Sequence, residues 1–84
     1  MYRIVPDDEV LAQVAELPVE ALAEFADLLE TLTVTPWNGD PQHADNPDGP
    51  VRRWHFGPGQ AGQLVYLILE ERDEVHPLLV QWLG

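Results

Sequence analysis

The chain contains no cysteine, no serine and no lysine. Without cysteine there can be no disulfide framework, no thiolate metal site and no cysteine nucleophile. The absence of serine and lysine removes Ser-His-Asp hydrolysis, Schiff-base chemistry and the phosphate-binding P-loop, because each of these needs a residue type that is missing. Few common enzyme classes remain open to this sequence.

Basic residues are scarce. Fifteen acidic side chains stand against four arginines, which gives a formal net charge of −11. Such a surface repels phosphate backbones, whose binding relies on Lys and Arg displacing counterions. The imbalance is uneven, because the first 35 residues hold eight acids and only Arg3, whereas Arg52, Arg53 and Arg72 lie in the second half. The charge therefore lowers the expectation of RNA cleavage without excluding it from the second half.

Long apolar runs are also absent, and no stretch approaches the roughly 18 residues that span a bilayer. The N-terminal residues lead into acids rather than a signal-peptide core. We expect a cytoplasmic protein with no membrane partner. Its 84 residues, 45% of them apolar, predict one folded domain over residues 1–84.

Two helices are expected in the first half. Asp7 or Asp8 can cap a helix over residues 9–17, and apolar residues recur there at helical spacing. Pro18 suits the first turn of a second helix that reaches about Leu32. The outer face of this helix is acidic without basic partners, so it is either a plain solvated face or a surface for a basic partner.

The second half predicts a long loop followed by strands. Proline, glycine and asparagine dominate residues 35–50, and three strands are expected at 51–56, 63–71 and 75–83. Residues 64–69 are all apolar, as in a strand covered on both faces, and Pro77 indicates an edge or a bulge. With a short N-terminal strand at 2–5, the prediction is an α+β fold of order β-α-α-β-β-β, a helical hairpin packed on a four-stranded, mainly antiparallel sheet.

This order of elements resembles the RelE/ParE toxin superfamily. The resemblance covers nearly the whole chain and is closest to short actinobacterial-type members. It is carried by the helical hairpin, the loop with Pro36-Trp37 and Asp40-Pro41, and the segments Val51–Phe56, Gln63–Ile68 and Glu74–Trp82. It implies a toxin–antitoxin setting, with a cognate antitoxin or another protein as partner, or a homodimer. Active members cleave ribosome-bound mRNA without a metal.

The same resemblance implies candidate catalytic residues. Arg52 and Arg53 match basic positions of the family's second strand, and Tyr66 matches an aromatic of its third. Where the family commonly has an arginine before the third strand's Leu-Val-Tyr, this chain has Gln63, and it ends before the basic C-terminal segment of active members. Positive groups must stabilise the phosphate while another group moves the 2′-OH proton. The candidates for these roles are Arg52, Arg53, His55, Tyr66, Arg72 and His76.

Each candidate also has a structural interpretation. Both strand arginines can pair with nearby carboxylates, and both histidines can be solvated residues of a strand face. By the alternation of side chains in a strand, Arg53 and His55 share one face and Arg52 the other. Asp40, His43, Asp45 and Asp48 fit turn chemistry better than a metal site. We therefore expect no metal and no cofactor.

Three functions remain open. The first is a protein-binding or regulatory member of the RelE/ParE superfamily with weak or no ribonuclease activity. The second is an active ribosome-dependent mRNA interferase, which would be a metal-independent endoribonuclease. The third is an orphan acidic domain whose charge reflects a composition bias of its proteome.

Overall fold

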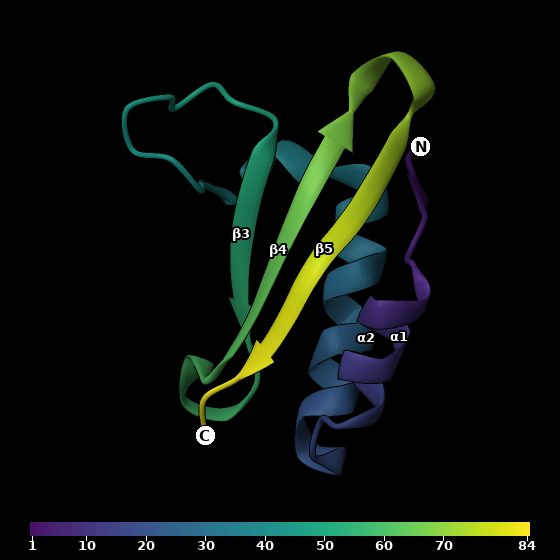
Figure 1. The fold of residues 1–84 in the computed structure, drawn as a ribbon, viewed down its shortest axis with the longest axis vertical. Coiled ribbons are helices and arrows are strands. Elements are labelled where there is room, and N and C mark those ends of the chain that lie inside the picture. The colour runs from purple at the N-terminus through teal and green to yellow at the C-terminus, as the bar shows by residue number, and fades with distance from the viewer.

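A computed structural model describes residues 1–84 as an α+β fold, with two helices packed on one side of a twisted sheet (Figure 1). The helices are α1 (Asp8–Ala15) and α2 (Val19–Val34). The strands are β1 (Arg3–Ile4), β2 (Asp40–Pro41), β3 (Val51–Phe56), β4 (Gly62–Leu69) and β5 (Glu74–Trp82). Short 3₁₀ turns lie at η1 (Pro36–Asn38), η2 (Pro58–Gln60) and η3 (Glu70–Arg72).

The sheet has the order β1-β5-β4-β3-β2, and only the β1–β5 pair is parallel. It therefore has five strands rather than the predicted four. The extra strand, β2, lies inside the segment predicted as a loop, where Asp40 and Pro41 pair with Arg53 and Arg52. Two residues are too few to leave an alternating pattern in the sequence. The expected irregularity near Pro77 is confirmed, because the β4–β5 register shifts between Val65 and Tyr66.

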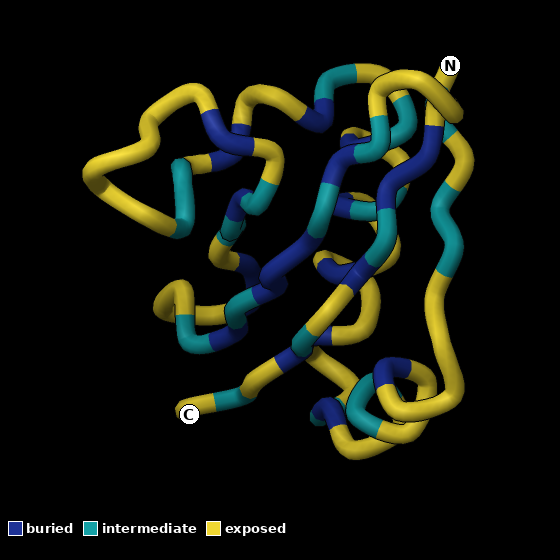
Figure 2. Tube along the Cα trace, turned by 45° about the horizontal axis from the view of Figure 1, so that its top comes forward, coloured by how far each residue is buried: buried dark blue, intermediate teal, exposed yellow.

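The helices begin where the sequence signals predict. Asp7 caps α1, its side chain accepting a hydrogen bond of 2.8 Å from the backbone N–H of Val10. Pro18 stands at the N-cap of α2. Because both helices are amphipathic, each turns one apolar stripe to the sheet and leaves its acids in solvent. In Figure 2 the exposed colour dominates the outer turns of the helices and the loop before β3.

One apolar core joins the helices to one face of β3, β4 and β5. Phe25 of α2 and Phe56 of β3 meet at its centre, with ring centroids 5.2 Å apart. Leu64, Tyr66 and Ile68 of β4 complete it from the sheet. The prediction that β4 is covered on both faces holds only in part: no helix lies on the other side, yet Val65 there is 7% exposed, and Leu67 and Leu69 are half-buried. Its apolar residues on that side are flanked by side chains of β3 and β5 instead.

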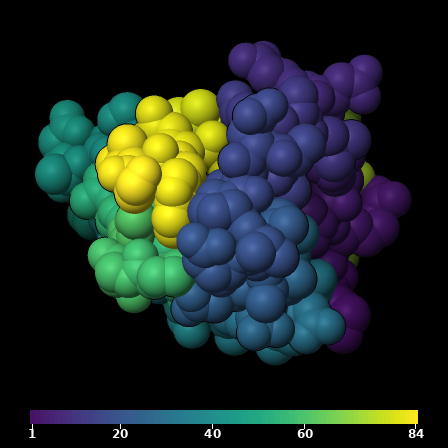
Figure 3. All heavy atoms as spheres, turned by 90° about the horizontal axis from the view of Figure 1, so that it is seen from below, coloured from purple at the N-terminus to yellow at the C-terminus, as the bar shows by residue number.

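The chain ends beside the helices. Seen from below in Figure 3, the C-terminal residues (yellow) and the η2 region (green) lie next to one another and border the helical layer (blue). The backbone N–H of Leu83 donates to the carbonyl of Ala61, which fixes this arrangement. At the same end Gly57 has φ +84°, and a side chain there would meet the indole of Trp82. The strand ends are thus packed together at one pole of the sheet.

Candidate functional site

The candidate site is the face of the sheet that carries no helix, called the open face below. Side chains alternate along a strand, and those of Leu64, Tyr66 and Ile68 point into the core. Their neighbours therefore line the open face. Following the register across the sheet, these residues are Val51, Arg53 and His55 of β3, Gln63, Val65, Leu67 and Leu69 of β4, and Glu74, His76, Leu79 and Gln81 of β5.

The register arranges these residues in rows across the sheet. His55, Gln63 and Gln81 form a polar row near η2. The next row holds Arg53, with Val65 and Leu79 beside it and Asp40 on its outer side.

His76 belongs to the row after that, opposite Leu67. His76 is two strands across and one row along from Arg53, so the two residues are more than about 10 Å apart at ordinary strand spacing. The open face thus combines a few polar side chains with an apolar centre.

Arg53 is the one arginine available on this face. It takes part in none of the side-chain hydrogen bonds or ion pairs of the structure. It borders a shallow cavity of about 250 Å³ together with Asn38, Asp40, His55 and Gln60. Asp40 lies opposite Arg53 in the register without forming an ion pair with it. The Arg53 guanidinium is therefore free to meet an anion.

Arg52 lies on the other face and is 8% exposed. Its guanidinium donates to three backbone carbonyls, those of Gly49 at 3.1 Å, Gly39 at 3.0 Å and Pro47 at 2.8 Å. It also stacks over the ring of Trp37, 5.1 Å from its centroid. No carboxylate pairs with it. Two of its nitrogens have partners in the loop between β2 and β3, and the third bonds to Gly39 between η1 and β2, so Arg52 fixes that loop against the segment that precedes β2.

Tyr66 also points away from the open face. Its side chain is completely buried, and its hydroxyl donates to the carbonyl of Pro36 at 2.7 Å. Burial raises the pKa of Tyr66 to about 12, although the nearby charge of Arg52 lowers it in part. The hydroxyl therefore connects β4 to η1 and is shielded from solvent.

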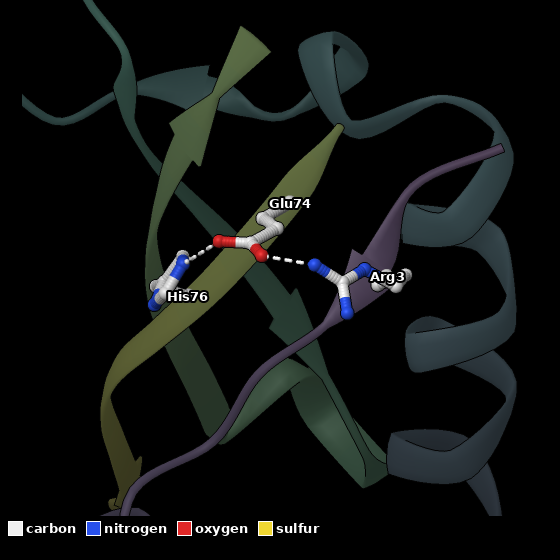
Figure 4. A network of polar contacts seen from close by, with 3 residues as sticks. All are labelled: Arg3, Glu74 and His76. Atoms are coloured by element: carbon white, nitrogen blue, oxygen red, sulfur yellow. Dashed lines mark hydrogen bonds and ion pairs between the residues drawn. The ribbon is translucent and has the colours of Figure 1, made fainter. Parts of the chain in front are cut away.

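His76 belongs to a polar cluster at the far end of the open face (Figure 4). Its Nε2 lies 2.8 Å from one carboxylate oxygen of Glu74, and Arg3 of β1 donates to the other oxygen. Hydrogen bonding by His76, followed by the charge of Arg3, holds the pKa of Glu74 below its usual value. Arg72 is exposed in η3 and forms no ion pair.

The structure thus divides the predicted candidates. Arg53, His55 and His76 share the open face, Arg52 and Tyr66 lie on the helix-covered face, and Arg72 lies in a turn. The sequence interpretation missed Asn38 and Gln60 beside Arg53 and Gln81 beside His55. It named Asp40 only as a turn residue and Gln63 only as the replacement of an arginine. Alternation within a strand gives Gln63 a face, but its neighbours depend on the register between strands.

Neither a metal centre nor a membrane segment is found. No group of three or more His, Asp or Glu residues could hold a metal ion. His43 and Asn46 instead lie in successive turns, in which the N–H of Asn46 donates to the carbonyl of His43 and the N–H of Gly49 to that of Asn46. No helix is long and apolar enough to span a bilayer.

Comparison with known proteins gives similarity at the level of structure. No family model and no curated protein matches the sequence. The crystal structure of the isolated E. coli RelE toxin matches with a TM-score of 0.80 at 14% identity, covering 100% of this chain and 86% of that one. The intact E. coli RelBE toxin–antitoxin complex gives 0.80 at 14% identity, covering 100% and 99%. The archaeal RelE–RelB complex from Pyrococcus horikoshii OT3 gives 0.67 at 15% identity, covering 99% and 96%.

These matches confirm the RelE-like fold that the order of elements predicted. At 14–15% identity they establish the fold alone. Two of these three structures are complexes of a RelE chain with its antitoxin.

Proposed function

We propose that this RelE-fold chain is a toxin-superfamily protein of toxin–antitoxin type that acts by binding a partner protein in the cytoplasm and has weak or no ribonuclease activity. One observation carries the proposal: of the four arginines, Arg53 alone offers a free guanidinium on the open face. Arg52 is used by the loop, Arg3 is paired with Glu74, and Arg72 lies in η3.

The chemistry of RNA cleavage explains why one free cation matters. A phosphate under attack gathers negative charge, and several positive groups usually share its stabilisation. Here a single guanidinium would act against a net charge of −11. Tyr66 is buried behind the sheet and its pKa is raised to about 12, so it is poorly placed to move a proton. The open face therefore lacks most of the electrostatic assistance that cleavage needs.

The first test is inducible expression of the full chain with a growth and transcript readout. We expect normal growth and no new transcript ends at high levels of folded protein. Rapid cleavage of mRNA on translating ribosomes by the purified protein, abolished by Arg53→Ala, would overturn the proposal.

The partner is tested separately. A cognate antitoxin encoded by the adjacent gene is the first candidate, and a second copy of the chain is the alternative. Light scattering after size exclusion, on the chain alone and with the neighbouring gene product, distinguishes the two. A stable heterocomplex supports the antitoxin, and a dimer of the chain alone supports self-association. A monomer that forms neither complex counts against a protein-binding role.

A second function, a minimal mRNA interferase, is favoured by one specific arrangement. Arg53 and His55 are unpaired neighbours on the open face, and His76 shares that face. In this role Arg53 would bind the phosphate, and the imidazole of a histidine would move the proton. Growth arrest lost in both Arg53→Ala and His55→Ala would establish it.

A further inference from the structure

One edge of the sheet is left without a partner beside α2. β2 pairs with Arg52 and Arg53 only, because the chain before Asp40 turns away into η1. The second half of β3, Trp54–Phe56, therefore pairs with no strand on its outer side. We call this place the β3 notch, defined by Trp54, His55 and Phe56.

At the notch, the backbone N–H and C=O of His55 point away from β4, in the plane of the sheet. The carbonyl of Val51 accepts from Gln42 on the outer side, whereas that of Pro50 accepts from Ile68 on the β4 side. Backbone groups alternate along a strand, so the odd-numbered residues of β3 present their N–H and C=O outward. His55 is thus an exposed donor and acceptor pair, of the kind that an added strand pairs with.

Two hollows meet at the notch. One of about 250 Å³ lies toward Asp40, and another of about 220 Å³ lies toward α2. Both are lined by Trp54, His55 and Gln60, so the two hollows adjoin one another on either side of these residues. They lie beyond the end of β2, a position that suits an extended chain continuing the line of β2.

The acidic residues of α2 beside the notch favour a positively charged occupant. Glu24 and Asp27 line the hollow on that side, with Trp54 and Phe56 as apolar neighbours. Neither acid forms an ion pair. A long cationic side chain can lay its methylenes on the aromatic rings and place its charge beside these carboxylates. An acidic segment would be repelled both here and by Asp40 at the other end.

We propose that the β3 notch binds an extended, basic segment of a partner protein. The segment pairs with the His55 backbone as a short added strand, and one of its cationic side chains lies between Glu24, Asp27 and Trp54. This inference rests on the proposed protein-binding function and names the place and chemistry of that binding.

The test uses the full chain and a defined probe, an eight-residue amidated peptide that alternates valine with arginine. A second peptide with glutamate in place of arginine is the control. Amide NMR spectra are recorded during titration. We expect shifts centred on the His55 amide, the Trp54 indole and the α2 residues around Glu24 with the arginine peptide, and none with the glutamate peptide. Shifts spread over α1 and α2 without a change at His55 would overturn the proposal.

Two pairs of variants separate specific docking from general attraction to an acidic protein. Glu24→Gln with Asp27→Asn should weaken binding about fivefold, whereas Glu9→Gln with Glu16→Gln at α1, which removes the same charge, should weaken it less than about twofold. His55→Pro, which removes the outward N–H, should weaken binding at least about tenfold, and His55→Ala should retain it. Equal losses in the two charge pairs would contradict the proposed site.

Failure of this site is distinguishable from failure of the proposed function. Diffuse peptide binding removes the notch as a docking site and leaves a protein-binding role elsewhere on the surface intact. Growth arrest with cleaved transcripts removes the proposed function, while a localised peptide response at His55 would still stand. The fold of each variant is checked by its amide spectrum before titration.

Discussion

Two neighbouring arginines lie on opposite faces of the sheet and have opposite surroundings. Arg52 turns to the helix-covered side, where three carbonyls and an indole hold it. Arg53 turns to the open side and has no partner. The difference arises from the period of two in a strand. It teaches that the basic pair in the sequence provides one structural residue and one available charge, so counting arginines overstates the basic character of the site.

The helix-covered face should be the more sensitive of the two, and Gly39 is closely packed against it. A β-carbon added at Gly39 would overlap the Tyr66 hydroxyl oxygen. The backbone of Gly39 is ordinary extended chain, so space alone requires glycine. We expect Gly39→Ala to cost about 3 kcal/mol or more, because it disrupts both the Tyr66 hydrogen bond and the carbonyl that Arg52 uses. Urea unfolding measures this.

Gly59→Ala is the control for that substitution. Gly59 has φ +65°, and a β-carbon added there would meet no atom within 4 Å. A cost of about 1 kcal/mol is expected from the backbone conformation alone. If Gly39→Ala is no more costly than Gly59→Ala, the close packing of the helix-covered face has been overestimated.

The sequence predicted this division only in part. Helical spacing indicated both helices, and β-prone runs indicated the three long strands to within two residues, because these elements bury continuous apolar stripes. Alternation placed Arg52 and Arg53 on different faces, as the structure shows. It could not say which face the helices cover, so Tyr66, which is buried behind the sheet, still stood among the candidates.

The surroundings of each arginine could not be predicted. The partners of Arg52 are carbonyls in an irregular loop, and every residue type has a carbonyl, so the sequence carries no signal for them. The β3 notch depends on where β2 ends, and a two-residue strand leaves no pattern. Glu74 and Arg3 are 71 positions apart and meet because β1 pairs in parallel with β5. Register and loop conformation therefore set most of the site.

Replacing Arg52 and Arg53 in turn by methionine tests the difference between the two faces most directly. Arg52→Met leaves the carbonyls of Gly39, Gly49 and Pro47 without this donor, and we expect a loss of about 2–3 kcal/mol. Arg53→Met should change stability by less than about 0.5 kcal/mol. Thermal unfolding followed by circular dichroism measures both. Equal effects would mean that the guanidinium of Arg52 contributes no more to folding than a solvated one.

Alkaline pH should lower the folding stability because it ionises the buried Tyr66 hydroxyl. The pKa of this hydroxyl is about 12 in the folded chain and 10.0 in its ordinary state. The folded state therefore holds the Tyr66 proton more tightly than the unfolded chain does. The contribution of the protonated hydroxyl to folding stability is complete below pH 10 and is lost as pH rises toward 12. Tyr66→Phe should cost about 1–2 kcal/mol at neutral pH by removing the bond to Pro36. The variant should also flatten the stability curve between pH 10 and 12, and an unchanged curve would contradict this origin.

Acid pH tests the open face, where the smallest effect is expected. The pKa of Glu74 is lowered in the folded chain, first by its hydrogen bond with His76 and then by Arg3. A lowered pKa means that the folded state binds this proton less readily than the unfolded chain does. The ionised Glu74 carboxylate therefore contributes to folding stability above its ordinary pKa of 4.5, and this contribution fades at lower pH. Glu74→Gln should reduce the acid-side loss of stability, and His76→Ala should reduce it in the same direction. By the same linkage, both variants should be less stable than the parent at neutral pH and should approach it as the pH falls below 4.5. Their loss at neutral pH should still be smaller than that of Arg52→Met.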